Sequence, residues 1–291
     1  MAPVRADTPA VRTRGIAAVV ACLMLVGVTG GGGAGARTGP LRGATRLAPP
    51  TACPGCWQPG LKVSWQWQLA NPPKAAALLD VKMYDVDGFD ASKPLIAAMH
   101  TRGIKVVCYI SAGSWEDWRP DAGDFPASVL GRSNGWPGEK WLDIRDLASL
   151  GPIMQARLDM CRRKGFDAVE FDNVDGYQNR TGFPLSGRDQ LRYNVFLANQ
   201  AHARGLSAFL KNDIDQVKEL LPYFDAELNE QCFQYAECGK IVPFVAAGKP
   251  VFNVEYKLDV AQFCAKANAK DFNSLKKRLA LDAWRVPCRG A

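Results

Sequence analysis

The feature that most constrains the fold is a repeated unit in which an apolar-periodic segment ends at a glycine and a short apolar run follows. Such segments stop at Gly103, Gly165 and Gly205. Glycine is typical of helix ends, and short runs rich in β-branched and aromatic residues are typical of buried strands. The repeat therefore predicts an α/β protein in which helices alternate with the strands of a parallel sheet.

The runs and the segments between them can be assigned along the chain. Predicted strands span 63–69, 81–87, 105–111, 168–172, 206–211, 224–229, 250–255 and 279–284, with helix-like segments at 95–100, 153–164, 191–203 and 260–269. Eight strands favour a closed (β/α)8 TIM barrel over an open sheet, and we assign residues 61–291 to this single domain. The short run at 141–144 (WLDI) is interpreted either as a ninth strand or as an extension within the long loop from 112 to 147.

The N-terminal segment is expected to be removed rather than folded. Residues 1–36 combine a basic start, an apolar run and a small-residue cleavage site, which is the pattern of a secretory signal peptide. Residues 37–60, rich in glycine, proline, threonine and arginine, are interpreted as a linker and lead-in. A lipid anchor at Cys22 is an alternative, but the apolar run continues past it. We therefore expect a secreted monomer without a membrane span.

Charge and cysteine content narrow the function classes. The net charge of +7 at pH 7 is spread along the chain, so no nucleic-acid partner is expected. An even number of cysteines remains once Cys22 leaves with the signal peptide, which fits disulfides in an oxidising compartment. Cys108, within a predicted strand, is interpreted as a buried apolar residue. With two histidines in the chain, no metal or other cofactor is expected. The predicted local disulfides are Cys53–Cys56, Cys232–Cys238 and Cys264–Cys288.

Acidic residues gather at the C-terminal ends of the predicted strands. In a TIM barrel these ends meet on one face, where the active site lies. An acidic face with few cations suits a hydroxyl-rich or cationic ligand and does not suit phosphate. Aromatic residues near the same ends could stack on sugar rings, although each is also explained as core. The acids are Asp85, Asp87, Glu170, Asp172, Asp175, Asp213, Glu227, Glu230 and Glu255, and the aromatics are Trp65, Trp67, Trp115, Trp118, Trp136 and Tyr177.

Strand 168–172 carries the most specific signal. Val169 and Phe171 share one side of the strand, so Glu170 and Asp172 share the other and are predicted to point into the barrel. A buried carboxylate pair is too costly to persist without partners or a function. Two carboxylates at strand ends can hydrolyse a glycosidic bond, because one group protonates the departing oxygen while the other traps the oxocarbenium-like centre.

Six ordered motifs between about 61 and 260 resemble glycoside hydrolase family 114, whose characterised members are endo-α-1,4-polygalactosaminidases. The motifs are WQWQL at 65–69, CYISAGS at 108–114, WLDIR at 141–145, EFDNVDGY at 170–177, NEQC at 229–232 and PVFNVEY at 250–256. The resemblance implies a TIM barrel that cuts a galactosamine-containing exopolysaccharide internally with retention of configuration. It also implies that Asp172 is the nucleophile and Glu230 the general acid/base, with the reverse order left open. The sugar-contacting residues are expected to be Trp65, Asp85, Tyr109, Asn173, Asp175, Tyr177, Lys211, Asn212 and Glu255.

Strand alternation disagrees with the motif over the second carboxylate. Glu230 lies on the same side of its strand as Leu228, whereas Glu227 lies on the opposite side. If Leu228 packs against the helices, Glu227 is the inward acid, unless the loop that begins at Cys232 turns Glu230 toward the cleft. Three other functions also remain open: an α-glycosidase of different specificity, a non-catalytic carbohydrate-binding barrel and a metal-dependent barrel.

Overall fold

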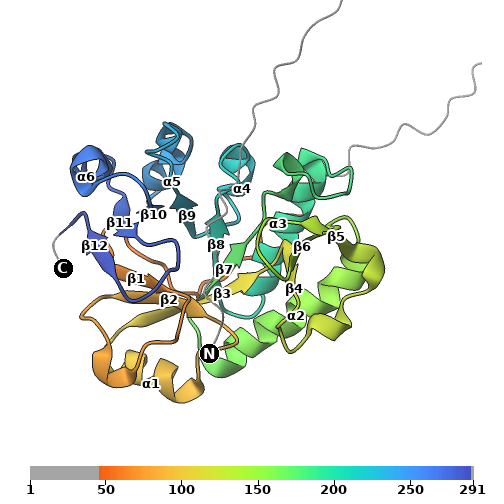
Figure 1. The fold of residues 1–291 in the computed structure, drawn as a ribbon, viewed down its shortest axis with the longest axis horizontal. Helices are drawn as coiled ribbons and strands as arrows, with labels where there is room; N and C mark the ends of the chain where they lie inside the picture. Colours follow the sequence, from red (N-terminus) through yellow and green to blue (C-terminus); the bar gives the residue numbers. More distant parts are fainter. Residues whose placement is uncertain (1–45, 290–291) are drawn as a thin grey trace, which may run out of the picture.

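The computed structural model describes residues 46–289, which form a nearly closed barrel surrounded by helices (Figure 1). Each of the first eight strands of the sheet is parallel to its neighbour, and the last is antiparallel. The indole Nε1 of Trp65, on the first strand, donates to the carbonyl of Asn273 on the eighth at 2.9 Å, which brings the two edges together. The predicted (β/α)8 fold is confirmed. In order, the strands are β1 (Trp65–Gln68), β2 (Met83–Asp87), β3 (Lys105–Ser111), β7 (Ala168–Asp172), β8 (Ser207–Lys211), β9 (Ala226–Glu230), β10 (Val251–Glu255), β11 (Asn273–Lys277) and β12 (Arg285–Pro287).

Helices cover the outside of the barrel, and the four helix-like segments predicted from the sequence fall on them. Gly165 ends the longest helix in the left-handed conformation, with φ of 98°, as a glycine stop predicts. A single 3-10 turn replaces an α-helix between β1 and β2. The helices are α1 (Lys93–Thr101), α2 (Leu147–Lys164), α3 (Gly187–His202), α4 (Val217–Leu220), α5 (Val242–Ala246) and α6 (Val260–Ala269), and the 3-10 turns are η1 (Ala75–Ala77), η2 (Ala122–Asp124), η3 (Ala127–Val129), η4 (Gly176–Gln178) and η5 (Cys238–Lys240).

The sheet is apolar on both faces. Its inner face carries a buried apolar cluster that includes Trp65, Trp67 and Leu228. In this cluster the rings of Phe209 and Phe252 stack with their centroids 5.5 Å apart. Its outer face packs against the helices through a larger cluster. An apolar residue therefore does not reveal which face of a strand it occupies.

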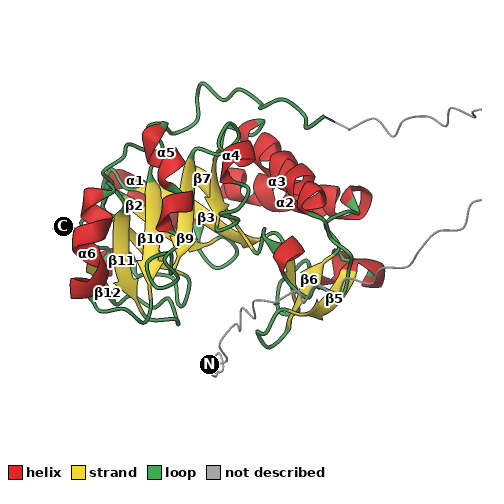
Figure 2. Ribbon diagram, turned by 90° about the horizontal axis from the view of Figure 1, so that it is seen from above, coloured by secondary structure: helices red, strands yellow, loops and turns green. Residues whose placement is uncertain are grey.

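A small antiparallel sheet is inserted between β3 and α2 and projects beside the barrel (Figure 2). It consists of β4 (Ser114–Glu116), β5 (Leu130–Ser133) and β6 (Glu139–Leu142), with β6 in the centre. Because it follows the C-terminal end of β3, it begins on the strand-end face. Of the two interpretations offered for 141–144, the extension within the loop is confirmed.

One strand prediction is wrong. The eighth barrel strand is β11, at Asn273–Lys277, whereas 279–284 forms a loop. Leu275 is the one apolar residue of β11, and it points into the inner cluster. Backbone pairing with β10 holds this polar strand, so no apolar run marks it in the sequence.

The described part of the lead-in packs against the barrel. The ring of Trp57 lies 6.1 Å from that of Phe209 at an angle of 35°, and the carbonyl of Trp57 accepts a hydrogen bond from Ser207 at the start of β8. The amide of Thr51 donates to Asn199 on α3. These contacts place residues 46–60 across the N-terminal end of the barrel. The predicted signal peptide lies outside the described residues.

Four disulfides connect the described chain, and the three predicted pairs, Cys53–Cys56, Cys232–Cys238 and Cys264–Cys288, are confirmed. The interpretation of Cys108 as a free apolar residue is wrong, because it is bonded to Cys161 and ties β3 to α2. Sequence alternation places Cys108 on the outer face of β3, but the residue it meets there depends on how α2 packs. Within residues 46–289 no helix is long and apolar enough to cross a membrane.

Candidate active site

Three carboxylates from two strands surround one buried ammonium at the C-terminal end of the barrel. Nζ of Lys211, the last residue of β8, lies 3.0 Å from Oε1 of Glu170, 2.9 Å from Oδ1 of Asp172 and 3.4 Å from Oε2 of Glu230. Glu170 and Asp172 come from β7, and Glu230 ends β9. Strands β7, β8 and β9 are neighbours in the sheet, so their inward side chains at equivalent heights converge.

Trp67 supports this ion cluster from β1. Its indole ring lies 4.6 Å from Nζ of Lys211, and its Nε1 donates to Oε2 of Glu170 at 3.1 Å. Burial alone would lower the pKa of Lys211, but the surrounding carboxylates, Asp172 first, raise it well above its usual value. Lys211 is therefore a fixed positive charge at the centre of the site.

Asp172 is held as a carboxylate. Burial alone would raise its pKa, but the ammonium of Lys211 and the hydroxyl of Tyr109 outweigh this effect and lower it. Tyr109 donates to Oδ2 of Asp172 at 2.8 Å, and Nδ2 of Asn173 lies 3.2 Å from the same oxygen. An ionised, oriented carboxylate of this kind can act as a nucleophile.

Glu230 has different neighbours. The hydroxyl of Tyr256 donates to Oε1 at 2.5 Å, and Nδ2 of Asn212 donates to Oε2 at 3.2 Å. Asn173, Asn212 and Gln231, which follow the three strand ends, all adopt positive φ, between 52° and 63°. Asparagine tolerates this left-handed conformation better than most residues, which explains its place after β7 and β8.

Asp85 lies beneath the cluster on β2 and is fully buried. Within the described chain neither of its oxygens meets a hydrogen-bond donor. Burial and the neighbouring charge of Glu170 raise the pKa of Asp85 well above its usual value. Burial is also the first cause of the raised pKa of Glu170, which Lys211 opposes.

The structure brings some of the predicted sugar-contacting residues to the carboxylates and leaves others apart. Tyr109, Asn173, Lys211 and Asn212 contact Asp172 or Glu230 directly. Trp65 instead lies in the inner core, and Glu255 is buried on the outer face, where it accepts from the amide of Phe233. Asp175 and Tyr177 lie on the loop after β7, near Asp213.

The alternation-based preference for Glu227 as the inward acid is wrong. Ala226 and Leu228 belong to the inner cluster, so Glu230, on the same side of β9, points into the barrel. Glu227 points outward and is fully buried, and neither of its oxygens has a hydrogen-bond partner among the described residues. The sequence expectation failed because it assigned the apolar side of β9 to the helices, whereas this barrel also has an apolar interior.

Two contacting residues were not assigned to the site from the sequence: Trp67, which was named only among the aromatics near the strand ends, and Tyr256. Trp67 is the last inward residue of β1, and Tyr256 is the first inward residue after β10. The alternation that places Val254 inside the barrel also places Tyr256 there. Counting by two along each strand from a known inward residue could have found both.

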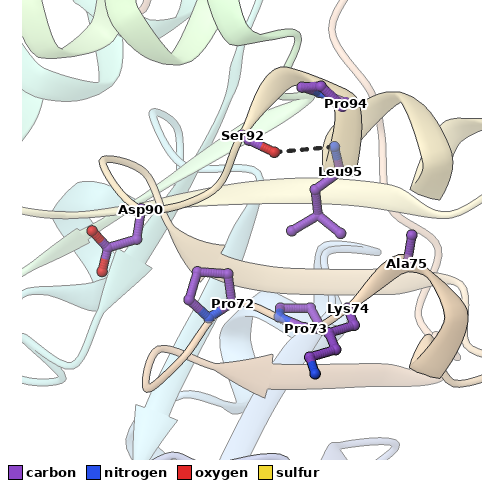
Figure 3. Close-up of a pocket in the computed structure, with 8 residues that line it drawn as sticks. All are labelled: Pro72, Pro73, Lys74, Ala75, Asp90, Ser92, Pro94 and Leu95. Carbon is purple, nitrogen blue, oxygen red and sulfur yellow. Dashed lines mark hydrogen bonds between the residues drawn. The ribbon is translucent and has the colours of Figure 1, made fainter. Parts of the chain in front are cut away.

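Two surface hollows lie away from these carboxylates. One, of about 420 Å³, lies between the β1–β2 connection and the N-terminus of α1, where Ser92 accepts from the amide of Leu95 (Figure 3). Another, of about 520 Å³, is lined by Trp115 and Trp136 of the inserted sheet. Neither contains the paired carboxylates, so the reactive groups rather than the hollows define the candidate site. Across residues 46–289 no group of three or more histidine, cysteine or acidic residues is arranged to hold a metal ion.

A barrel with inward carboxylates at the ends of two strands, here β7 and β9 on either side of β8, is typical of the class of TIM-barrel glycoside hydrolases. The chain belongs to glycoside-hydrolase family GH114, whose family model matches residues 46–291. The structure of Aspergillus fumigatus Ega3 in complex with galactosamine is similar, with 39% identity and a TM-score of 0.76 over 82% of this chain and 99% of that one.

Two more distant similarities were found, one in structure and one in sequence. The glycoside hydrolase domain of PelA from Pseudomonas aeruginosa is 17% identical, with a TM-score of 0.63 over 77% of this chain and 97% of that chain. A protein of Deinococcus radiodurans without an assigned function is 27% identical over 209 residues, which are 62% of this chain and 64% of that protein. This chain thus spans less than two thirds of that relative.

Proposed function

We propose that the protein cleaves internal α-1,4-galactosaminidic bonds of a galactosamine-containing polysaccharide, with Asp172 as nucleophile and Glu230 as general acid/base. The observation that carries the proposal is the contact of both carboxylates with the single ammonium of Lys211. Membership of family GH114 and the similarity to a galactosamine-bound protein support the substrate class.

In the first step, an oxygen of Asp172 bonds to the anomeric carbon while the glycosidic bond breaks, and the proton of Glu230 passes to the departing oxygen. In the second, Glu230 takes a proton from water, the water oxygen bonds to the anomeric carbon and Asp172 is released. The lowered pKa of Asp172 keeps the nucleophile ionised. Tyr256 can donate to the carboxylate form of Glu230 or accept from its acid form.

Retention is supported by the spacing of the pair. The Asp172 and Glu230 oxygens nearest Lys211 lie at most about 6.3 Å apart, which is the sum of their 2.9 Å and 3.4 Å distances to Nζ. Retaining enzymes hold their carboxyl groups about 5–5.5 Å apart, and inverting enzymes about 6.5–9.5 Å. For these two oxygens the bound is below the inverting range and admits the retaining spacing.

The charge of the site favours amino sugars. Three carboxyl groups, those of Glu170, Asp172 and Glu230, face one ammonium. With Glu230 protonated for its role as the acid, Glu170 and Asp172 still face a single ammonium, and this negative excess attracts a cationic galactosamine polymer despite the basic whole-chain charge. The four disulfides support secretion, because such bonds persist in oxidising compartments. We further expect the protein to act as a monomer.

The test is digestion of defined α-1,4-linked galactosamine and N-acetylgalactosamine oligomers, followed by mass spectrometry for cleavage position and NMR for the anomer formed first. Internal cuts that yield the α-anomer first support the proposal. Cleavage of other α-glycans with these oligomers intact would indicate a different specificity. Binding without cleavage would indicate a carbohydrate-binding barrel, and loss of activity on chelation would contradict the two-carboxylate mechanism.

A further inference from the structure

A row of buried polar side chains crosses the outer face of the sheet behind Glu230. Asn229 on β9, Asn253 on β10 and Ser274 on β11 are register partners, so their side chains lie at one height. Asn212 lies directly after β8 and continues the row, because its backbone N–H donates to the carbonyl of Leu228 on β9. Asn229, Asn253 and Ser274 are 2%, 0% and 3% exposed, on a face that packs mainly apolar residues against the helices and also carries the buried acids Glu227 and Glu255.

The backbone of Glu230 fixes the direction of this row. The N–H of Glu230 is an unambiguous donor, and it bonds to Oδ1 of Asn212 at 3.0 Å. The carboxamide of Asn212 therefore has its oxygen toward the backbone and its Nδ2 toward the carboxylate, where it donates to Oε2 of Glu230 at 3.2 Å. One asparagine thus bridges the main chain and the side chain of the proposed acid/base.

The same logic orients each next member. Nδ2 of Asn229 lies 3.3 Å from Oδ1 of Asn212, and Nδ2 of Asn253 lies 3.4 Å from Oδ1 of Asn229. The hydroxyl of Ser274 donates to Oδ1 of Asn253 at 2.9 Å and ends the row. Along the row each donor faces the member nearer Glu230, and each carboxamide is held in one of its two flip states by the next. Nδ2 of Asn253 also lies 3.5 Å from the carbonyl of Asn229 and 3.6 Å from Sγ of Cys232.

We propose that Asn229, Asn253 and Ser274 are positioning residues that hold Asn212 so that its Nδ2–H meets Oε2 of Glu230 as that carboxylate forms. The proposal rests on the proposed role of Glu230 as the general acid/base. With Tyr256 on Oε1, the row supplies a donor to each oxygen when the proton leaves. It therefore assists departure of a leaving group that must be protonated.

The experiment compares two substrates of the same galactosamine oligomer, one with a sugar as leaving group and one with 4-nitrophenolate, which departs without a proton. Asn229→Leu should lower kcat/KM, which reports the step that breaks the glycosidic bond, about tenfold on the first substrate, a fraction of what general acid catalysis contributes, and less than about twofold on the second. Ser274→Ala, at the far end of the row, should shift the ratio of the rates on the two substrates in the same direction by a smaller factor. It provides the test if Asn229→Leu does not fold.

Asn273→Leu is the matched control. Asn273 is the neighbour of Ser274 on β11, but its side chain bonds Leu61 and Val63 in the segment before β1. This variant should lower the melting temperature while leaving the ratio of the two rates unchanged. An unchanged ratio in Asn229→Leu and Ser274→Ala, or the same altered ratio in Asn273→Leu, would overturn the proposal.

A crystal structure of Asn229→Leu separates this proposal from the proposed function. The Nδ2 of Asn212 should leave hydrogen-bonding distance of Oε2 of Glu230. If wild-type protein cleaves neither substrate, the proposed function fails, and the position of Asn212 in the variant still decides whether the row orients it. An unmoved Asn212 would contradict the positioning role whatever the activity.

Discussion

Lys211 and Asp172 form a buried ion pair, with Nζ 2.9 Å from Oδ1 and side chains 3% and 20% exposed. The pair joins the ends of β8 and β7, and Glu170 and Glu230 share the same ammonium. A single cation thus compensates several acids, so its removal affects both stability and chemistry.

Lys211→Met should lower the free energy of unfolding by about 3–5 kcal/mol at neutral pH, because buried carboxylates lose their partner. The ammonium lowers the pKa of Asp172, so its loss raises that pKa. The acidic limb of the kcat/KM profile should then move to higher pH. Denaturant titration and pH-rate profiles measure these effects. Lys276→Met, which breaks an exposed pair with Asp259, is the control. An unshifted acidic limb would remove Lys211 from this role.

Glu230→Gln should reduce kcat on the polymer by about 10²–10⁴-fold, the usual contribution of a general acid/base. Glu227→Gln should retain near-wild-type turnover, because Glu227 points away from the cluster. Burial raises the pKa of Glu227 well above its usual value, so its ionisation opposes folding as the pH rises. The glutamine variant should accordingly gain stability relative to wild type with increasing pH. Inactive Glu227→Gln beside active Glu230→Gln would reverse the assignment.

Asp213→Asn should change how stability depends on pH. Burial, with the charge of Asp175, raises the pKa of Asp213 to about 9 from the usual 3.8. The folded state then binds more protons than the unfolded state between about pH 4 and pH 9. Asp213 therefore lowers the free energy of unfolding as the pH rises through this window, by up to about 1.4 kcal/mol per pH unit. The variant should gain on wild type across this window in denaturant titrations. Parallel curves would contradict the buried-acid interpretation.

Removing the Cys108–Cys161 bond with paired alanines should destabilise the fold more than removing Cys53–Cys56. Their sequence separations are 53 and 3, and chain-entropy estimates give about 4 and about 1.6 kcal/mol. Thermal unfolding of the two double variants without reductant measures the difference. Equal losses would indicate that strain or residual structure, rather than loop entropy, dominates.

The sequence predicted most of the barrel, because repeated helix, glycine and strand signals are local. It missed β11, where Leu275 is the one apolar residue and pairing with β10 holds the strand. It also correctly placed Glu170 and Asp172 inward on β7, because Val169 and Phe171, on the opposite side of that strand, pack in the outer cluster against the helices.

Tertiary structure decided the rest of the site. Strand alternation gives two sides but does not say which is inside when both faces of the sheet are apolar, so Glu227 and Glu230 could not be told apart by this rule. Likewise, Cys108 finds Cys161 only because α2 packs on β3.

The sequence by itself determined the order of strands and the acids that end them. Only the closed barrel decided that Lys211 meets Asp172 and Glu230, because those contacts join residues 39 and 19 positions apart. Distances of about 3 Å across neighbouring strands depend on register and curvature, which no local pattern specifies.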